Sequence, residues 1–102
     1  MNETFLDAIN QMLILRVTFS SHEKGTITRI CIPFDFGPSR RYKDGLDRYH
    51  FYDLDSPEGN HTLSILPEQI YKLELTTKTF EPGDYVKWVP KWFYKRDWGA
   101  FS

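Results

Sequence analysis

The sequence predicts a mainly β protein with an N-terminal helix, five short strands and an aromatic-rich C-terminal extension, all within one domain of 102 residues. Apolar residues recur at helical spacing only over residues 1–13. Over residues 14–80 they alternate with polar residues in short runs separated by turn-forming sequences, which is typical of half-buried strands. Residues 81–102, called the C-terminal segment below, contain all three tryptophans. We expect these aromatic side chains to be buried, either on the domain's own sheet or on a partner.

The predicted helix has one apolar stripe. Asn2 or Thr4 is suited to cap its N-terminus, because short polar side chains accept hydrogen bonds from the free N–H groups of the first turn. The stripe consists of Phe5, Leu6, Ile9, Met12 and Leu13. We expect this helix to close one end of the hydrophobic core.

The first two predicted strands form a hairpin. Residues 14–19 alternate in polarity, residues 20–25 are turn-forming, and residues 26–33 make the second strand. Proline has no backbone N–H, so Pro33 is expected to end this strand or to place it at a sheet edge. A long polar connection is predicted over residues 35–47.

Residues 48–54 and 61–66 are predicted to form the clearest hairpin, and a tight turn over residues 66–69 leads to a fifth strand around residues 71–75. Five short strands joined by tight turns favour a small barrel of the SH3 or Sm type, because closing the sheet removes exposed strand edges.

Composition limits the function. The net charge is -1, so the field of the whole molecule does not attract nucleic acid or an anionic membrane, and such binding would need a local patch. The single cysteine, Cys31, lies in an apolar run and is expected to be a buried, unreactive side chain. The N-terminus has the wrong charge order for a signal peptide, and no apolar run reaches a membrane span. We expect a cytoplasmic protein without a membrane partner.

No catalytic or metal-binding pattern is present in the sequence. The three histidines, His22, His50 and His61, are not accompanied by a second cysteine or by carboxylates at ligand spacing. His50 and His61 are candidates to face each other across a hairpin, and a hydrogen-bonded pair is favoured over a ligand pair. There is no nucleophile elbow and no glycine-rich phosphate loop. The sequence therefore predicts no enzyme activity, no metal site and no cofactor.

The order of elements resembles that of the WYL domain family. The resemblance spans roughly residues 5–82 and is carried by Ala8-Ile9, by Arg29 followed by Pro33, and by Arg48-Tyr49-His50. It continues through residues 61–70 to Phe80, although only Tyr49 of the tripeptide that names the family is kept. The resemblance implies an Sm-like barrel and a regulatory role in bacteria, in which a nucleotide-like or nucleic-acid ligand is bound. We expect a diverged, stand-alone relative.

Two sets of residues are candidates for ligand contact. The first is Arg29, Arg48, Tyr49 and His61, predicted on neighbouring strands, where guanidinium groups can grip an anion and Tyr49 can stack on a flat ring. The alternative is that both arginines pair with surface carboxylates.

The second set combines cations and aromatic rings, as single-stranded nucleic acid binding requires. Its leading candidates are Arg40, Arg41, Lys43, Trp92, Lys95 and Arg96. They belong to a wider group of C-terminal cations and rings that also includes Lys87, Trp88, Lys91, Tyr94 and Trp98. The alternative is that these aromatics only pack, either on the barrel or on a second copy of the chain in a homodimer. The function hypothesis is therefore a non-catalytic module that senses an anionic small ligand or single-stranded nucleic acid, in transcriptional regulation or defence. Its alternative is a protein–protein interaction or homodimerisation module that uses the aromatic C-terminal segment.

Overall fold

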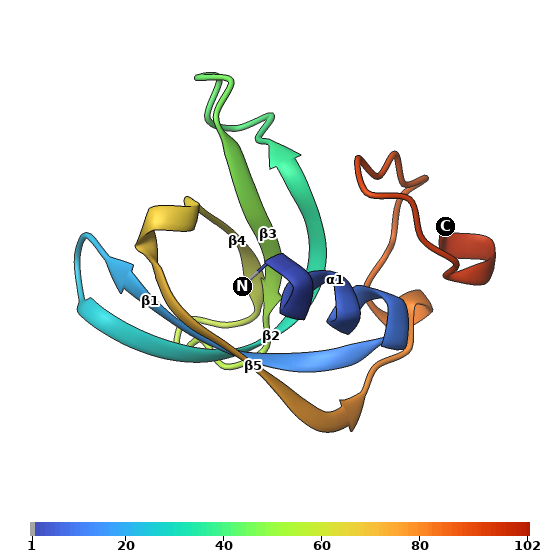
Figure 1. Ribbon diagram of the computed structural model, residues 1–102, viewed down its shortest axis with the longest axis horizontal. Coiled ribbons are helices and arrows are strands. Elements are labelled where there is room, and N and C mark those ends of the chain that lie inside the picture. Colours follow the sequence, from blue (N-terminus) through green and yellow to red (C-terminus); the bar gives the residue numbers. More distant parts are fainter. Residues whose placement is uncertain (1) are drawn as a thin grey trace.

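A computed structural model describes residues 2–102 (Figure 1). Met1, included in the predicted helix, lies outside the described residues. The elements are α1 (Asn2–Gln11), β1 (Leu13–Ser21), β2 (Gly25–Pro38), β3 (Asp47–Asp53), β4 (His61–Ile65) and β5 (Ile70–Thr79). Three short 3-10 turns complete them, η1 (Pro67–Gln69), η2 (Pro82–Asp84) and η3 (Gly99–Phe101). None of the described helices has the length and apolar character needed to cross a membrane.

The five strands form one antiparallel sheet in the order β4-β3-β2-β1-β5. The prediction of a mainly β protein with an N-terminal helix is therefore confirmed. β4 and β5 are the two outer strands and do not pair with each other, so the sheet is open, and η1 connects these two edges. Figure 1 shows the sheet curving strongly around the side covered by α1.

The apolar stripe of α1 packs into the core through Phe5 and Ile9, whereas Leu6, Met12 and Leu13 of the predicted stripe are only partly buried. Phe5, Ala8 and Ile9 are completely buried. The Phe5 ring meets the rings of Tyr49 and Phe51 edge to face, with centroids 4.8 and 5.4 Å away. Edge-to-face contacts of this kind add to the gain from burying the rings. The helix thus packs against β3 on the inner face of the curved sheet.

The prediction for Pro33 was wrong, because β2 continues beyond it to Pro38. The physical reason is local pairing. β1 pairs with β2 only as far as Cys31, so the missing N–H of Pro33 leaves no gap in that ladder. On the other side Pro33 lies opposite Phe51, and a register shift before Asp35 absorbs the irregularity. The connection between β2 and β3 is consequently shorter than predicted and comprises residues 39–46.

The C-terminal segment packs against its own chain. Val86, Trp92 and Trp98 are all buried. The Trp98 indole N–H donates to the backbone carbonyl of Ile9 at 2.8 Å, at the end of α1. Figure 1 shows the segment beside this end of the helix and beside the far half of β2. It therefore covers the part of β2 that β1 leaves unpaired.

Candidate anion-binding cleft

A cleft of about 680 Å³ opens between the C-terminal segment and the β3–β4 hairpin. Its walls come from the end of β1, residues 39–42 of the connection, parts of β3 and β4, and residues 88–93. The volume is in the range of sites that hold a small organic molecule, about 300–1,000 Å³. Segments far apart in the sequence thus meet around one space.

The cleft is positively charged. Arg40, Arg41 and Lys91 line it, and none of them forms an ion pair with a carboxylate within residues 2–102. The only acidic residue of the lining is Asp35, whose carboxylate is already bound to Arg96 and to backbone N–H groups. A cleft lined by charges of one sign concentrates the field, so this one attracts anions.

The connection that carries the two arginines is ordered by its own polar side chains. The Ser39 hydroxyl accepts hydrogen bonds from the backbone N–H groups of Arg41 and Tyr42 at 3.1 and 3.2 Å. The Arg48 guanidinium lies over the Tyr42 ring, 4.3 Å from its centroid. These contacts close a turn at the end of β2 and hold Arg40 and Arg41 at the cleft.

His50 and Ser64, also in the lining, are direct partners across the β3–β4 hairpin. The Nδ1 atom of His50 lies 2.8 Å from the Ser64 hydroxyl oxygen, and its Nε2 atom lies 2.9 Å from the carbonyl oxygen of Gly37. A carbonyl oxygen only accepts, so Nε2 carries the hydrogen. In the neutral ring, Nδ1 is then the acceptor for the Ser64 hydroxyl. The sequence made His61 a candidate to face His50 across the hairpin, whereas in the structure His61 lies opposite Asp53.

Exposed apolar side chains form one rim of the cleft. Trp88 is 50% exposed, Phe93 is 61% exposed and Val89 is 85% exposed. The Phe93 ring rests on the backbone of Gly37, so closely that a Cβ atom at Gly37 would lie 2.5 Å from it. The cleft therefore combines unpaired cations with aromatic faces that are open to a ligand.

The first predicted set of residues does not form one surface. Arg29 pairs with the buried carboxylate of Asp53 at 3.4 Å. Arg48 makes two hydrogen bonds of 3.0 Å with Asp44, which lower the pKa of Asp44 and raise that of Arg48.

Tyr49, the third member of this set, is only 3% exposed and donates its hydroxyl hydrogen to the side chain of Asn2. Burial raises its pKa. His61 is the one member that lines the cleft. A ligand contacting all four residues would need the two arginines to leave their partners and Tyr49 to leave the core.

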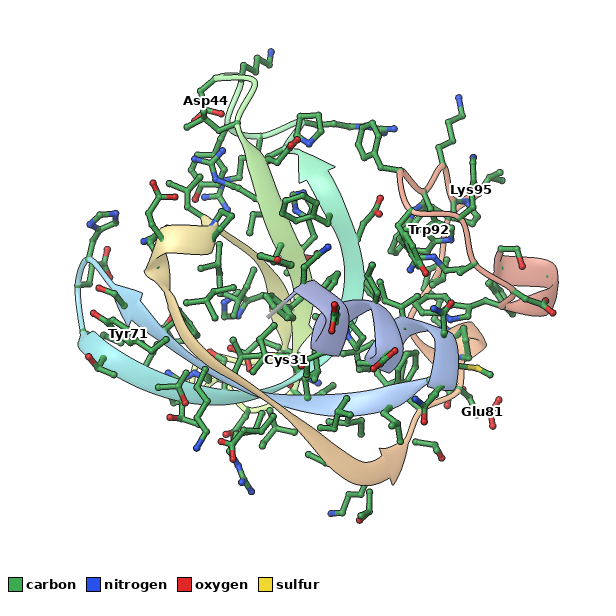
Figure 2. The ribbon with its side chains drawn as sticks, in the orientation of Figure 1. Cys31, Asp44, Tyr71, Glu81, Trp92 and Lys95 are labelled. Carbon is green, nitrogen blue, oxygen red and sulfur yellow. The ribbon has the colours of Figure 1, made fainter. Side chains whose placement is uncertain are left out.

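The second predicted set is divided between the cleft and other places. Arg40, Arg41 and Trp92 line the cleft, although Trp92 is only 8% exposed. Lys43 and Lys95 are exposed outside it, and Figure 2 shows Lys95 extending away from the protein.

Arg96 is buried, with its guanidinium against the rings of both Trp92 and Trp98, 4.0 and 4.5 Å from their centroids. Lys91, which belongs to the same predicted group of cations and aromatic rings, does line the cleft. Of the C-terminal cations in that group, the structure therefore brings Lys91 to the cleft and leaves Lys95 and Arg96 outside it.

The chain matches no protein-family model, no curated protein and no solved structure. Within residues 2–102 there is no group of three or more histidine, cysteine or acidic side chains placed to hold a metal ion. The charge and shape of the cleft are thus the features that indicate a function.

Proposed function

We propose that this protein is a non-catalytic, WYL-like regulatory module that binds an anionic, nucleotide-like ligand in the cleft. The observation that carries the proposal is the juxtaposition of three cations without carboxylate partners, Arg40, Arg41 and Lys91, with the exposed rings of Trp88 and Phe93. A nucleotide has the complementary chemistry, with a negatively charged phosphate and a flat base.

The two arginines suit a phosphate group because guanidinium groups donate paired hydrogen bonds to phosphate oxygens. Every base can stack on an aromatic side chain, so stacking depends little on the identity of the base. Each stacked base contributes about 1–3 kcal/mol of binding free energy. The cleft volume of about 680 Å³ suits a mononucleotide or the end of a single strand. Free nucleotides and single-stranded nucleic acid thus present the same chemistry to this cleft.

The fold supports the same proposal. We propose an Sm-like class for the sheet, and three features support it, namely the strand order β4-β3-β2-β1-β5, the N-terminal helix, and the 3-10 turn that joins the two edge strands. The sheet is open, so the closed barrel expected from the sequence is not part of the proposal. The cytoplasmic location and the bacterial regulatory setting implied by the WYL resemblance are part of it.

A second candidate function is protein–protein interaction or homodimerisation. It is favoured by the apolar side chains that the C-terminal segment leaves exposed, Trp88, Val89 and Phe93. Burial of the remaining aromatics on the same chain restricts this function to that rim. Sedimentation over a range of protein concentrations distinguishes it, because a dimer formed by the rim dissociates in a Val89→Asp variant, whereas an anion-binding monomer keeps one mass throughout.

The test is fluorescence anisotropy with two labelled probes, adenosine monophosphate and a short single-stranded oligonucleotide, at low and moderate salt. We expect saturable binding that weakens with salt, since phosphate contacts displace counterions. Arg40→Ala and Arg41→Ala should each weaken binding about tenfold or more, the loss expected for a hydrogen bond to a charged group.

Lys43→Ala and Lys95→Ala are matched controls, because both remove an exposed cation outside the cleft. Equal losses in the control and cleft variants would assign binding to general charge attraction and refute the site. Absence of binding to either probe at low salt would refute the proposed function.

A further inference from the structure

We propose that His50 and Ser64 form the phosphate-recognition element of the cleft, and that phosphate binding is coupled to uptake of one proton by His50. This inference rests on the proposed function, since it assigns two further contact residues to the same cleft. It also narrows the ligand to a group with several anionic oxygens, such as a phosphate, in preference to a carboxylate.

The geometry of the pair supplies the first step. The His50 ring is held at both nitrogens, by the Gly37 carbonyl and by the Ser64 hydroxyl. With the ring neutral, Nε2–H donates to Gly37 and Nδ1 accepts the hydroxyl hydrogen of Ser64. The hydroxyl hydrogen, the one donor hydrogen of the Ser64 side chain, is then used inside the protein and is not available to an anion.

Protonation of His50 reverses this hydrogen bond. Nδ1 then carries a hydrogen and donates it to the Ser64 oxygen, which has lone pairs to accept it. The hydroxyl hydrogen of Ser64 is released and can point to an anion in the cleft. One proton thus changes Ser64 from a satisfied donor into a free one, with both heavy-atom contacts kept at 2.8 and 2.9 Å.

The charges around the pair couple this change to anion binding. The connection contributes Arg40 and Arg41, and the C-terminal segment contributes Lys91, so a protonated His50 would share the cleft with three groups of the same charge. From β2, Asp35 lies opposite His50, but Arg96 already neutralises its carboxylate.

The remaining titratable groups of the lining are His22, at the end of β1, His61 on β4 and Tyr42 in the connection. A bound phosphate adds negative charge to the same space and offsets the repulsion among the cations. Proton uptake by His50 and anion binding therefore favour each other, as linked equilibria must.

The number of acceptor oxygens sets the ligand class. The two guanidinium groups, the lysine and the released hydroxyl are four separate donor groups, to which a carboxylate offers two oxygens and a terminal phosphate three. The exposed rings of Trp88 and Phe93 then receive the base of a nucleotide. A phosphate with an attached ring is consequently favoured over inorganic phosphate alone.

The experiment uses the full chain and titration calorimetry with adenosine monophosphate in buffers of different ionisation enthalpy, near neutral pH. The wild-type protein should take up protons on binding. This uptake appears as a non-zero slope when the observed binding enthalpy is plotted against the ionisation enthalpy of the buffer. His50→Gln keeps a donor for the Gly37 carbonyl but has no titrating nitrogen, so the part of the slope due to His50 should disappear. Ser64→Ala should bind about tenfold more weakly, and Ser64→Thr, which keeps the hydroxyl, should restore binding.

A second measurement needs no substitution and remains valid if a variant fails to fold. The ring nitrogens of His50 are followed by NMR while inorganic phosphate, adenosine monophosphate or an oligonucleotide without a terminal phosphate is added. We expect Nδ1 to become protonated with the first two probes, with adenosine monophosphate binding tighter. The same response to the oligonucleotide would assign recognition to the internal phosphodiester and overturn the preference for a terminal phosphate.

The failure of this inference is distinguishable from that of the proposed function. If adenosine monophosphate binds, yet Ser64→Ala leaves affinity unchanged and Nδ1 of His50 stays unprotonated, the pair is a cross-strand structural contact and the inference is wrong. If no phosphate-bearing probe binds the wild-type protein, the proposed function itself fails.

Discussion

The side chains of Asp35 and Arg96, 61 residues apart in the sequence, form a buried ion pair with 3.3 Å between Asp35 Oδ1 and Arg96 Nη2. The carboxylate also accepts the backbone N–H groups of Phe93 and Tyr94 at 2.8 and 3.0 Å, and the guanidinium donates to the carbonyl oxygens of Phe34 and Tyr94. Burial lowers the pKa of Arg96 to about 10, which still leaves it charged at neutral pH. This pair fastens the C-terminal segment to β2 and so builds one wall of the cleft.

Arg96→Met should strongly destabilise the protein. The substitution keeps much of the apolar volume but leaves the Asp35 carboxylate buried without its cation, and breaking a buried pair in this way costs about 3–5 kcal/mol. Urea denaturation measures the free energy of unfolding. Lys95→Met is the matched control, since its exposed side chain makes the substitution worth at most about 0.5 kcal/mol. Equal free energies of unfolding for the two variants would show that the ion pair does not stabilise the fold.

Gly37→Ala should be destabilising by about 1–3 kcal/mol, because the added Cβ atom overpacks the contact with Phe93. Two atoms of the ring would lie 2.5 and 2.8 Å from that Cβ. In a Phe93→Ala background the clash is absent, so the effect of Gly37→Ala should largely vanish. A double-mutant cycle in urea measures this coupling, and strictly additive effects would contradict the packing of Phe93 on Gly37.

Cys31 should react with thiol reagents only after the protein unfolds. Burial, with a smaller contribution from Asp53, raises the pKa of the thiol far above its usual range, and the thiolate is the reactive form. The unfolded thiol ionises from about pH 8.5, whereas the folded one stays neutral. This group's contribution to stability is therefore complete below that pH and is lost as the pH rises further. Labelling rates measured against urea concentration test this, and rapid labelling of the native protein would contradict the burial of Cys31.

Deletion of residues 85–102 should abolish cooperative folding. The deletion removes ring contacts of Phe34 and Phe80, including those with Trp92 and Trp98, and leaves the Asp35 carboxylate with only the backbone N–H of Phe36 as a partner. Circular dichroism during heating should show a broad or missing transition. If the segment instead served mainly to join two copies of the chain, the truncated protein would melt sharply and sediment as a monomer.

The sequence determined the features that depend on neighbours along the chain. Alternation of Leu15, Val17 and Phe19 predicts a strand, and the spacing of Phe5 and Ile9 predicts the helix, because each period reflects the geometry of its own element. Arg40 and Arg41 were candidates because the sequence places these cations in a long polar connection, in a chain that is also rich in aromatic residues.

Only the tertiary structure decided the features that depend on register and on distant partners. Pro33 stays inside β2 because β1 has already stopped pairing at Cys31, which no local rule for proline includes. His50 meets Ser64 because the hairpin register pairs these two positions, and a register change of one residue would send their side chains to opposite faces. Arg29 and Arg96 form ion pairs with carboxylates that are distant in the sequence, Asp53 and Asp35. Charge is a property of the residue, whereas its availability to a ligand depends on which other part of the chain folds against it.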